Sequence, residues 1–161
     1  MKVKYFIILS LLSLLLSACN TGAEPKEHLG EIYKVALDSI MEQDEALSSG
    51  MKFIAIDMAN FDSVDENDKE EILYYFREKY KVEVIDVTFE QLKEMGLFNP
   101  DTMVMDGVLL RLEKVDFKVN NNIFFEGSKY RSGDGAVGVE VTVHYKDNSW
   151  KSKEVHMTWI S

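Results

Sequence analysis

The stretch "AVGVEVTVHYKDNSWKSKEVHMTWIS" (residues 136–161) decides the fold of this chain. Apolar and other side chains alternate along its first part, as they do in a strand with one buried face. The turn-forming sequence Asp-Asn-Ser (147–149) follows, and the alternation then resumes. The pattern predicts a β-hairpin whose apolar face packs on a core. It also predicts that Val141 and Trp159 are buried on the same side of the sheet, facing the first helix.

The same alternation extends back towards the middle of the chain. It covers residues 107–130 and changes phase once, which predicts a β-bulge near Glu113 and Lys114. Residues 107–161 are therefore expected to form an antiparallel β-meander, with one side buried and the other side polar.

The first half of the chain has helical periodicity instead. Apolar residues recur at three- and four-residue spacing from Leu29 to Leu47, which predicts an amphipathic helix. Further elements are predicted as strands over 51–58 and 81–87 and helices over 63–80 and 88–96. This order indicates an α+β fold, in which N-terminal helices with short strands pack on the C-terminal antiparallel β-meander. The arrangement looks like that of cystatin-like and NTF2-like domains.

Residues 1–18 have the three parts of a secretory signal. Lys2 and Lys4 give a positive start, an apolar run over residues 5–16 follows, and small residues precede Cys19. The apolar run is shorter than the roughly 20 residues that a membrane-spanning helix needs. We therefore expect residues 1–18 to be a lipoprotein signal peptide that is removed.

The ending Leu-Ser-Ala-Cys resembles the bacterial lipobox, in which the cysteine thiol receives a diacylglyceryl group and becomes the first residue. Cys19 is the only cysteine in the 161 residues, so it is expected to be a lipid anchor. The resemblance implies attachment to the cell membrane through acyl chains such as palmitate, on the extracytoplasmic face. Residues 19–26 then form a lipidated tether, and residues 27–161 a single α+β domain of a size that buries its own core.

The composition narrows the choice of partners. The chain carries 28 Asp and Glu against 18 Lys and Arg, a net charge of −10. Nucleic acid is not expected as a partner, because phosphate binding needs a cationic face. The charge also disfavours electrostatic docking on anionic lipid. The expected partners are the membrane, through the lipid on Cys19, and an envelope protein or small ligand.

Three side chains on the polar side of the meander are the candidate site residues. His144 and His156 lie on adjacent predicted strands, opposite in phase to the valines. A three-residue hairpin loop places Glu140 opposite His156. A carboxylate beside an imidazole can serve as an acid–base pair or as half of a metal site. The same residues are also ordinary on the solvated side of a sheet.

No catalytic residue, cofactor or metal is predicted elsewhere. The acidic stretch over residues 62–71 lacks the ligand spacing and glycine of a calcium loop, and it fits a solvated helix start. The glycine-rich segment over residues 132–138 lacks the Lys-Ser/Thr ending of a phosphate-binding loop, and a hairpin connection explains it.

Four stretches carry a wider resemblance: "FIAIDMANF" (53–61), "KEMGLFNPDTMVMDG" (93–107), "GSKYRSGDGAVGVE" (127–140) and "MTWIS" (157–161). Together they resemble a family of small lipoproteins from Bacillus-like Gram-positive bacteria. The resemblance spans most of residues 27–161. The family is uncharacterised, and its members are sometimes labelled peptide ABC transporter substrate-binding proteins. The resemblance supplies no functional residues.

These observations predict a membrane-anchored lipoprotein that acts as a non-catalytic binding or accessory module. A small ligand-binding receptor associated with an ABC transporter is the alternative, although such receptors usually close two lobes on a ligand. An enzyme that uses the polar face of the sheet is the third possibility.

Overall fold

The computed structural model describes residues 23–61, 63–118 and 121–161. The predicted signal peptide, Cys19 and the start of the tether lie outside the described residues. The helices, with 3-10 turns marked η, are η2 Pro25–Glu27, α2 Leu29–Met41, η3 Glu45–Ser48, α3 Glu66–Tyr80 and α4 Phe89–Glu94. The strands are β1 Phe53–Asp57, β2 Glu83–Asp86, β3 Phe98–Asn99, β4 Val104–Phe117, β5 Asn122–Ser132, β6 Gly135–Lys146 and β7 Ser149–Ile160.

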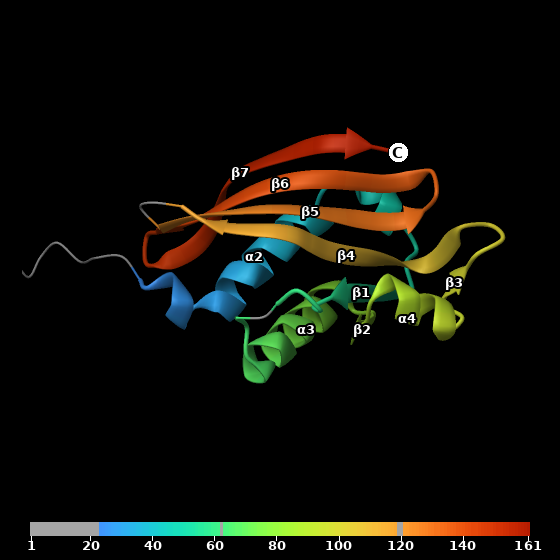
Figure 1. Cartoon of the computed structure of the whole chain (residues 1–161), viewed down its shortest axis with the longest axis horizontal. Helices are drawn as coiled ribbons and strands as arrows, with labels where there is room; N and C mark the ends of the chain where they lie inside the picture. The colour runs from blue at the N-terminus through green and yellow to red at the C-terminus, as the bar shows by residue number, and fades with distance from the viewer. Residues whose placement is uncertain (1–22, 62, 119–120) are drawn as a thin grey trace, which may run out of the picture.

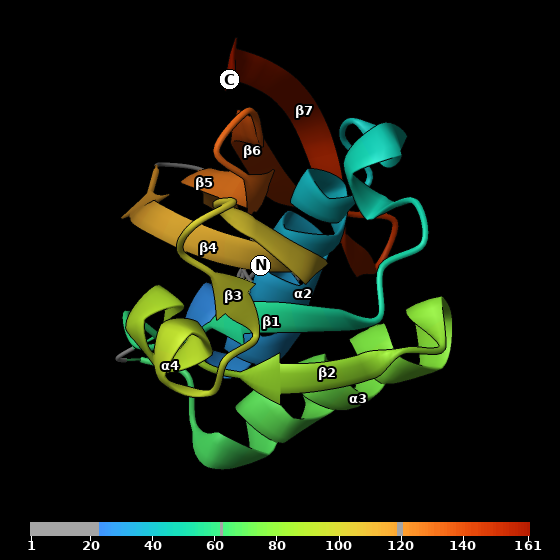
Figure 2. The same cartoon turned by 90° about the vertical axis from the view of Figure 1, so that its right-hand side faces the viewer.

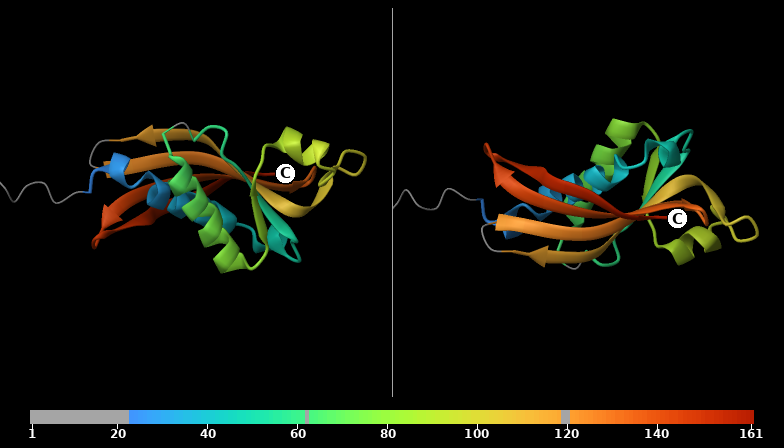
Figure 3. Two further views of the ribbon diagram at one scale, coloured as in Figure 1. Left: turned by 90° about the horizontal axis from the view of Figure 1, so that it is seen from below. Right: turned by 90° about the horizontal axis from the view of Figure 1, so that it is seen from above.

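The strands form one mixed sheet in the order β2-β1-β4-β5-β6-β7, with β3 paired to β4. Strands β4 to β7 are the predicted antiparallel meander, and it is long and twisted (Figures 1 and 3). Strand β1 runs parallel to both β2 and β4, so the short N-terminal strands extend the sheet beyond the meander. The predicted α+β class is confirmed.

Helices α2 and α3 cover one face of the sheet, which we call the inner face, and α4 lies on the opposite, outer face (Figure 2). The main core joins Leu37 and Ile40 of α2 and Phe76 of α3 to Phe125 and Val141 of the meander. A smaller core lies under α4. Because α4 is short, most of the outer face of β4 to β7 has no helix over it (Figures 1 and 2).

Helix α2 ends at Met41, earlier than the predicted end at Leu47. Asp44 has a left-handed backbone conformation with φ of 45°, which a continuous helix cannot contain. The next residues form the separate turn η3. The apolar residue at position 47 fits the helical spacing without belonging to the helix, which is why periodicity extended the prediction too far.

The predicted bulge is confirmed, because the β4–β5 register shifts between Leu112 and Lys114. Two further shifts interrupt the β6–β7 pairing, and one of them lies between the pairs Gly138/Trp159 and Val139/Met157. The extra residue at this shift is Thr158, and it turns Trp159 to the outer face.

The prediction that Trp159 is buried beside Val141 is therefore wrong. Val141 is fully buried on the inner face, but Trp159 is 47% exposed on the outer face. The indole lies directly over Gly138, where an added Cβ would overlap it. A bulge of one residue reverses every side chain beyond it, because side chains alternate with a period of two.

Candidate functional site

The outer face of the meander carries the polar residues that the sequence singled out. Glu140 lies opposite His156 in the β6–β7 register, as predicted, and Glu126 lies opposite Glu140 from the other side. The predicted three-residue loop is wrong: Lys146 pairs with Ser149 across a two-residue turn, and the register shift at Lys153 brings His156 opposite Glu140. Lys114 of β4 continues this row and forms an ion pair with Glu126 at 2.7 Å. The row therefore runs across four strands, with its charges side by side on the sheet surface.

His144 does not belong to this row. It lies opposite Lys151, four positions along β6 from Glu140. Within the described residues, no hydrogen bond or ion pair joins Glu140 to either histidine. No group of three or more His, Cys, Asp or Glu in the described part of the chain could hold a metal ion. Glu140, His144 and His156 thus share a face without forming a converged site.

A groove lies beside Trp159 on this outer face, and we call it the Trp159 groove. Its first hollow has a volume of about 240 Å³. The apolar and aromatic walls of this hollow are Phe89, Leu109, Tyr130, Ala136 and Trp159, and its polar side chains are Arg111, Glu113 and Ser128. A second hollow of about 230 Å³ is also lined by Trp159, together with Glu126 and Glu140. Trp159 and Glu113 therefore line both an apolar hollow and an acidic one.

The polar side chains of the first hollow are held by neighbouring groups. Arg111 is 3.4 Å from the carboxylate of Asp57 at the end of β1. The Ser128 hydroxyl donates a hydrogen bond of 2.9 Å to Glu113. All these residues except Phe89 stand on strands, so the sheet fixes the shape of the groove.

A larger hollow of about 490 Å³ lies beside β3 and the start of β1. Its charged pair is Lys52 and Asp106, joined at 2.6 Å, and the hydrogen bond from Lys52 lowers the pKa of the Asp106 carboxyl. Much of the remaining wall is the connection through Gly96, Asn99 and Thr102. This hollow offers no half-exposed aromatic ring.

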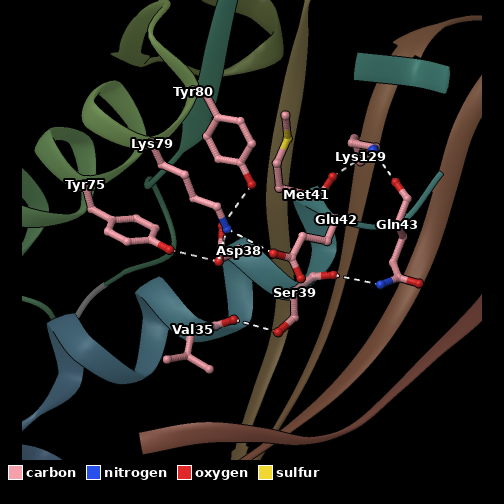
Figure 4. Close-up of polar contacts among 10 residues, drawn as sticks. All are labelled: Val35, Asp38, Ser39, Met41, Glu42, Gln43, Tyr75, Lys79, Tyr80 and Lys129. Carbon is pink, nitrogen blue, oxygen red and sulfur yellow. Dashed lines mark hydrogen bonds and ion pairs between the residues drawn. The ribbon is translucent and has the colours of Figure 1, made fainter. Parts of the chain in front are cut away.

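A polar cluster around Asp38 joins α2 to α3 (Figure 4). The Tyr75 and Tyr80 hydroxyls each donate a hydrogen bond of 2.9 Å to the Asp38 carboxylate. Lys79 donates to Asp38 at 2.6 Å and to Glu42 at 2.9 Å. Asp38 stands outside the apolar spacing of its helix, as a solvated residue would, but α3 covers it.

The pKa shifts in this cluster indicate a structural role. Burial raises the pKa values of Tyr75 and Tyr80, and the neighbouring Asp38 raises them further. Burial alone would lower the pKa of Lys79, but its hydrogen bonds to Asp38 and Glu42 outweigh that effect and raise it. Groups that hold their protons so firmly are poor acid–base catalysts near neutral pH.

A second buried polar feature is Lys129, whose ammonium group closes the end of α2 (Figure 4). The side chain is fully buried on the inner face. Its Nζ donates to the carbonyl oxygens of Met41 at 2.9 Å and Asp44 at 2.9 Å, and also to that of Gln43. The Ser48 hydroxyl is a fourth partner at 3.2 Å. Burial lowers the pKa of Lys129 to about 8.

Sequence patterns did not reveal the Trp159 groove, the Asp38 cluster or the Lys129 contacts. One signal was present for Lys129, because it shares its phase with Ile123 and Phe125 along β5. A lysine in the buried phase of a strand indicates a buried ammonium group with acceptors nearby.

Comparisons with models of protein families, with curated proteins and with solved structures found no match to this chain. None of the helices in the described residues is both long and apolar enough to cross a membrane.

Proposed function

We propose that this chain is an extracytoplasmic lipoprotein, anchored through Cys19, and that the Trp159 groove is its non-catalytic binding surface. The observation that carries the binding role is the half-exposed indole that lines two hollows on the sheet. Aromatic side chains in such positions contribute strongly to binding, because they bury a large apolar area at low entropic cost.

The size of the groove favours a protein or peptide partner. Each hollow beside Trp159 is below the roughly 300–1,000 Å³ of typical small-molecule pockets. Each is large enough to receive a side chain. The apolar hollow fits an apolar side chain. The acidic hollow fits a basic one through Glu140, because Glu126 is already paired with Lys114.

One observation favours the alternative function, a small ligand-binding receptor. It is the hollow of about 490 Å³ beside β3. Its pair of Lys52 and Asp106 is joined internally, which leaves Glu83 as the other charged residue of its lining. The Trp159 groove presents more side chains that a partner can engage, so it is the better candidate.

The position of the groove agrees with anchoring at the N-terminus. The first described residues lie at one end of the molecule, and β7 ends towards the other (Figure 1). Trp159 is close to the end of β7, so the groove lies towards the end of the domain that is away from the first described residues.

Replacing Cys19 with alanine is expected to abolish anchoring. Without the thiol no lipid can be attached, and the protein should accumulate as uncleaved precursor or appear in the medium. Cell fractionation followed by immunoblotting measures this. A Ser17→Thr chain serves as the control that keeps the cysteine. Mature-sized Cys19→Ala protein that stays in the membrane fraction would disprove the lipid-anchor proposal.

A photo-reactive phenylalanine analogue at position 130 is expected to crosslink a partner in living cells. Tyr130 lines the groove, whereas Tyr74 is 61% exposed on α3 and serves as the control position. A discrete product should form from position 130 and not from position 74. Adding Trp159→Ala should remove it, with a stability loss below about 1 kcal/mol because the indole is half exposed. The same product from both positions, or one unaffected by Trp159→Ala, would refute the groove as the binding surface.

A further inference from the structure

Strand β7 is an open edge of the sheet. It is the last strand in the sheet order, and no strand of the described residues pairs with its free edge (Figures 1 and 2). Three large apolar side chains near its end are exposed: Met157 by 48%, Trp159 by 47% and Ile160 by 67%. Exposed apolar edge strands are rare in monomeric proteins, because they present unpaired backbone groups to other strands.

The two faces of β7 are fixed by its pairing with β6. Glu154 and His156 lie opposite Thr142 and Glu140, so both point to the outer face. Lys151 and Trp159 also point outwards, opposite His144 and Gly138. Trp150 and Ile160 lie on the inner face, opposite Tyr145 and Val137.

From this pattern we infer that two copies of the chain pair antiparallel along β7, about a two-fold axis at Val155. In that register Glu154 lies opposite the partner's His156 on the outer face, and symmetry repeats the pair. The imidazole can donate a hydrogen bond to the carboxylate. Lys151 lies opposite the partner's Trp159 on the same face, at the position for a cation–π contact.

The inner face adds little in the same register. Trp150 lies opposite the partner's Ile160, but its ring is only 3% exposed and its backbone N–H already donates to Glu31 of α2 at 3.3 Å, so the outer-face pairs carry the register. Opposite charges and apolar pairs stabilise directly opposed positions, and like charges destabilise them. An axis at Glu154 would instead place two carboxylates opposite each other, and an axis at His156 would place two imidazoles opposite each other.

This self-pairing does not rest on the proposed binding function, although Trp159 takes part in both. A chain that binds no partner in its groove could still pair along β7, and the measurements below concern only the association of two copies. The result would be one continuous sheet across both copies, with the two Trp159 grooves on its same face.

Cysteine pairing tests the register. Full chains carrying Glu154→Cys and His156→Cys, each with a different tag, are co-expressed and oxidised in isolated membranes. A disulfide-linked dimer containing both tags is expected, with several-fold less product from either chain expressed alone. The parent chain, whose single cysteine is Cys19, controls for other thiol products. Equal yields from single and mixed chains would overturn the register.

Sedimentation of the full chain in detergent tests the association itself. The parent chain is expected to be a dimer, and His156→Glu should become monomeric because the new carboxylate would lie opposite the partner's Glu154. Glu154→Lys should raise the dissociation constant at least tenfold. Urea melts check that both variants remain folded. A parent chain that is monomeric would overturn self-pairing. If position 154 then crosslinks to a different protein in cells, that protein is the one that pairs with β7.

Discussion

Replacing Lys129 with methionine is expected to lower the free energy of unfolding by about 2–4 kcal/mol. Methionine fills a similar volume, but it donates no hydrogen bonds. The carbonyl oxygens of Met41, Gln43 and Asp44 would lose their common donor at a place from which water is excluded. Urea titration followed by circular dichroism measures the loss, read from the midpoint at constant slope.

Lys114→Met is the matched control for this change. Lys114 lies on the neighbouring strand β4, but its side chain is exposed and its one ion pair is with Glu126. An exposed pair of this kind contributes about 1 kcal/mol or less. Equal losses for the two variants would show that the contacts at the end of α2 do not hold η3 in place.

Asp38→Ala is expected to destabilise the protein by about 2–4 kcal/mol at neutral pH. The change removes the shared acceptor of Tyr75, Tyr80 and Lys79, and it leaves an ammonium group and two hydroxyls between α2 and α3 with fewer partners. Glu71→Ala is the control, because Glu71 also joins the two helices, through Lys34 at 3.2 Å, but is itself 63% exposed. A loss no larger than that of the control would contradict the role of Asp38.

The stability that Asp38→Ala removes should depend on pH in a defined direction. The pKa values of Tyr75 and Lys79 are raised in the folded protein above their ordinary values of 10.0 and 10.5. The folded state therefore keeps protons that the unfolded state loses, so the stabilisation is complete below about pH 10 and declines above it. The difference in unfolding free energy between parent and Asp38→Ala should shrink as the pH rises beyond 10. A difference that grows instead would show that Asp38 is not the acceptor.

The sequence predicted the elements of the fold because their patterns are local. The apolar spacing of α2, the valine alternation of β6 and the phase change at Glu113 each need only a short window. The opposition of Glu140 and His156 was also predicted, but from a three-residue loop that does not form. The turn has two residues between Lys146 and Ser149, and the extra residue Lys153 at the register shift brings His156 opposite Glu140.

Features that depend on a second element could not be predicted in the same way. Asp38 looks solvated until α3 is placed over it. The bulge at Thr158 leaves no mark in the apolar pattern, since Met157, Trp159 and Ile160 are apolar on both faces. The bulge turns Trp159 into the groove, so the groove could not be predicted without the bulge.

The place of β1 in the sheet determines when this protein can fold as it is synthesised. β1 lies between β2 and β4, and both partners come later in the chain. During synthesis, a chain that ends before Val104 has α2 and β1 but none of the meander that completes their core. Ile54 and Ile56, fully buried in the finished domain, would stay uncovered for that time. Partly made chains of this kind are prone to aggregate. Folding must therefore wait for the C-terminal half, and a holding chaperone acting on the emerging first half would raise the yield.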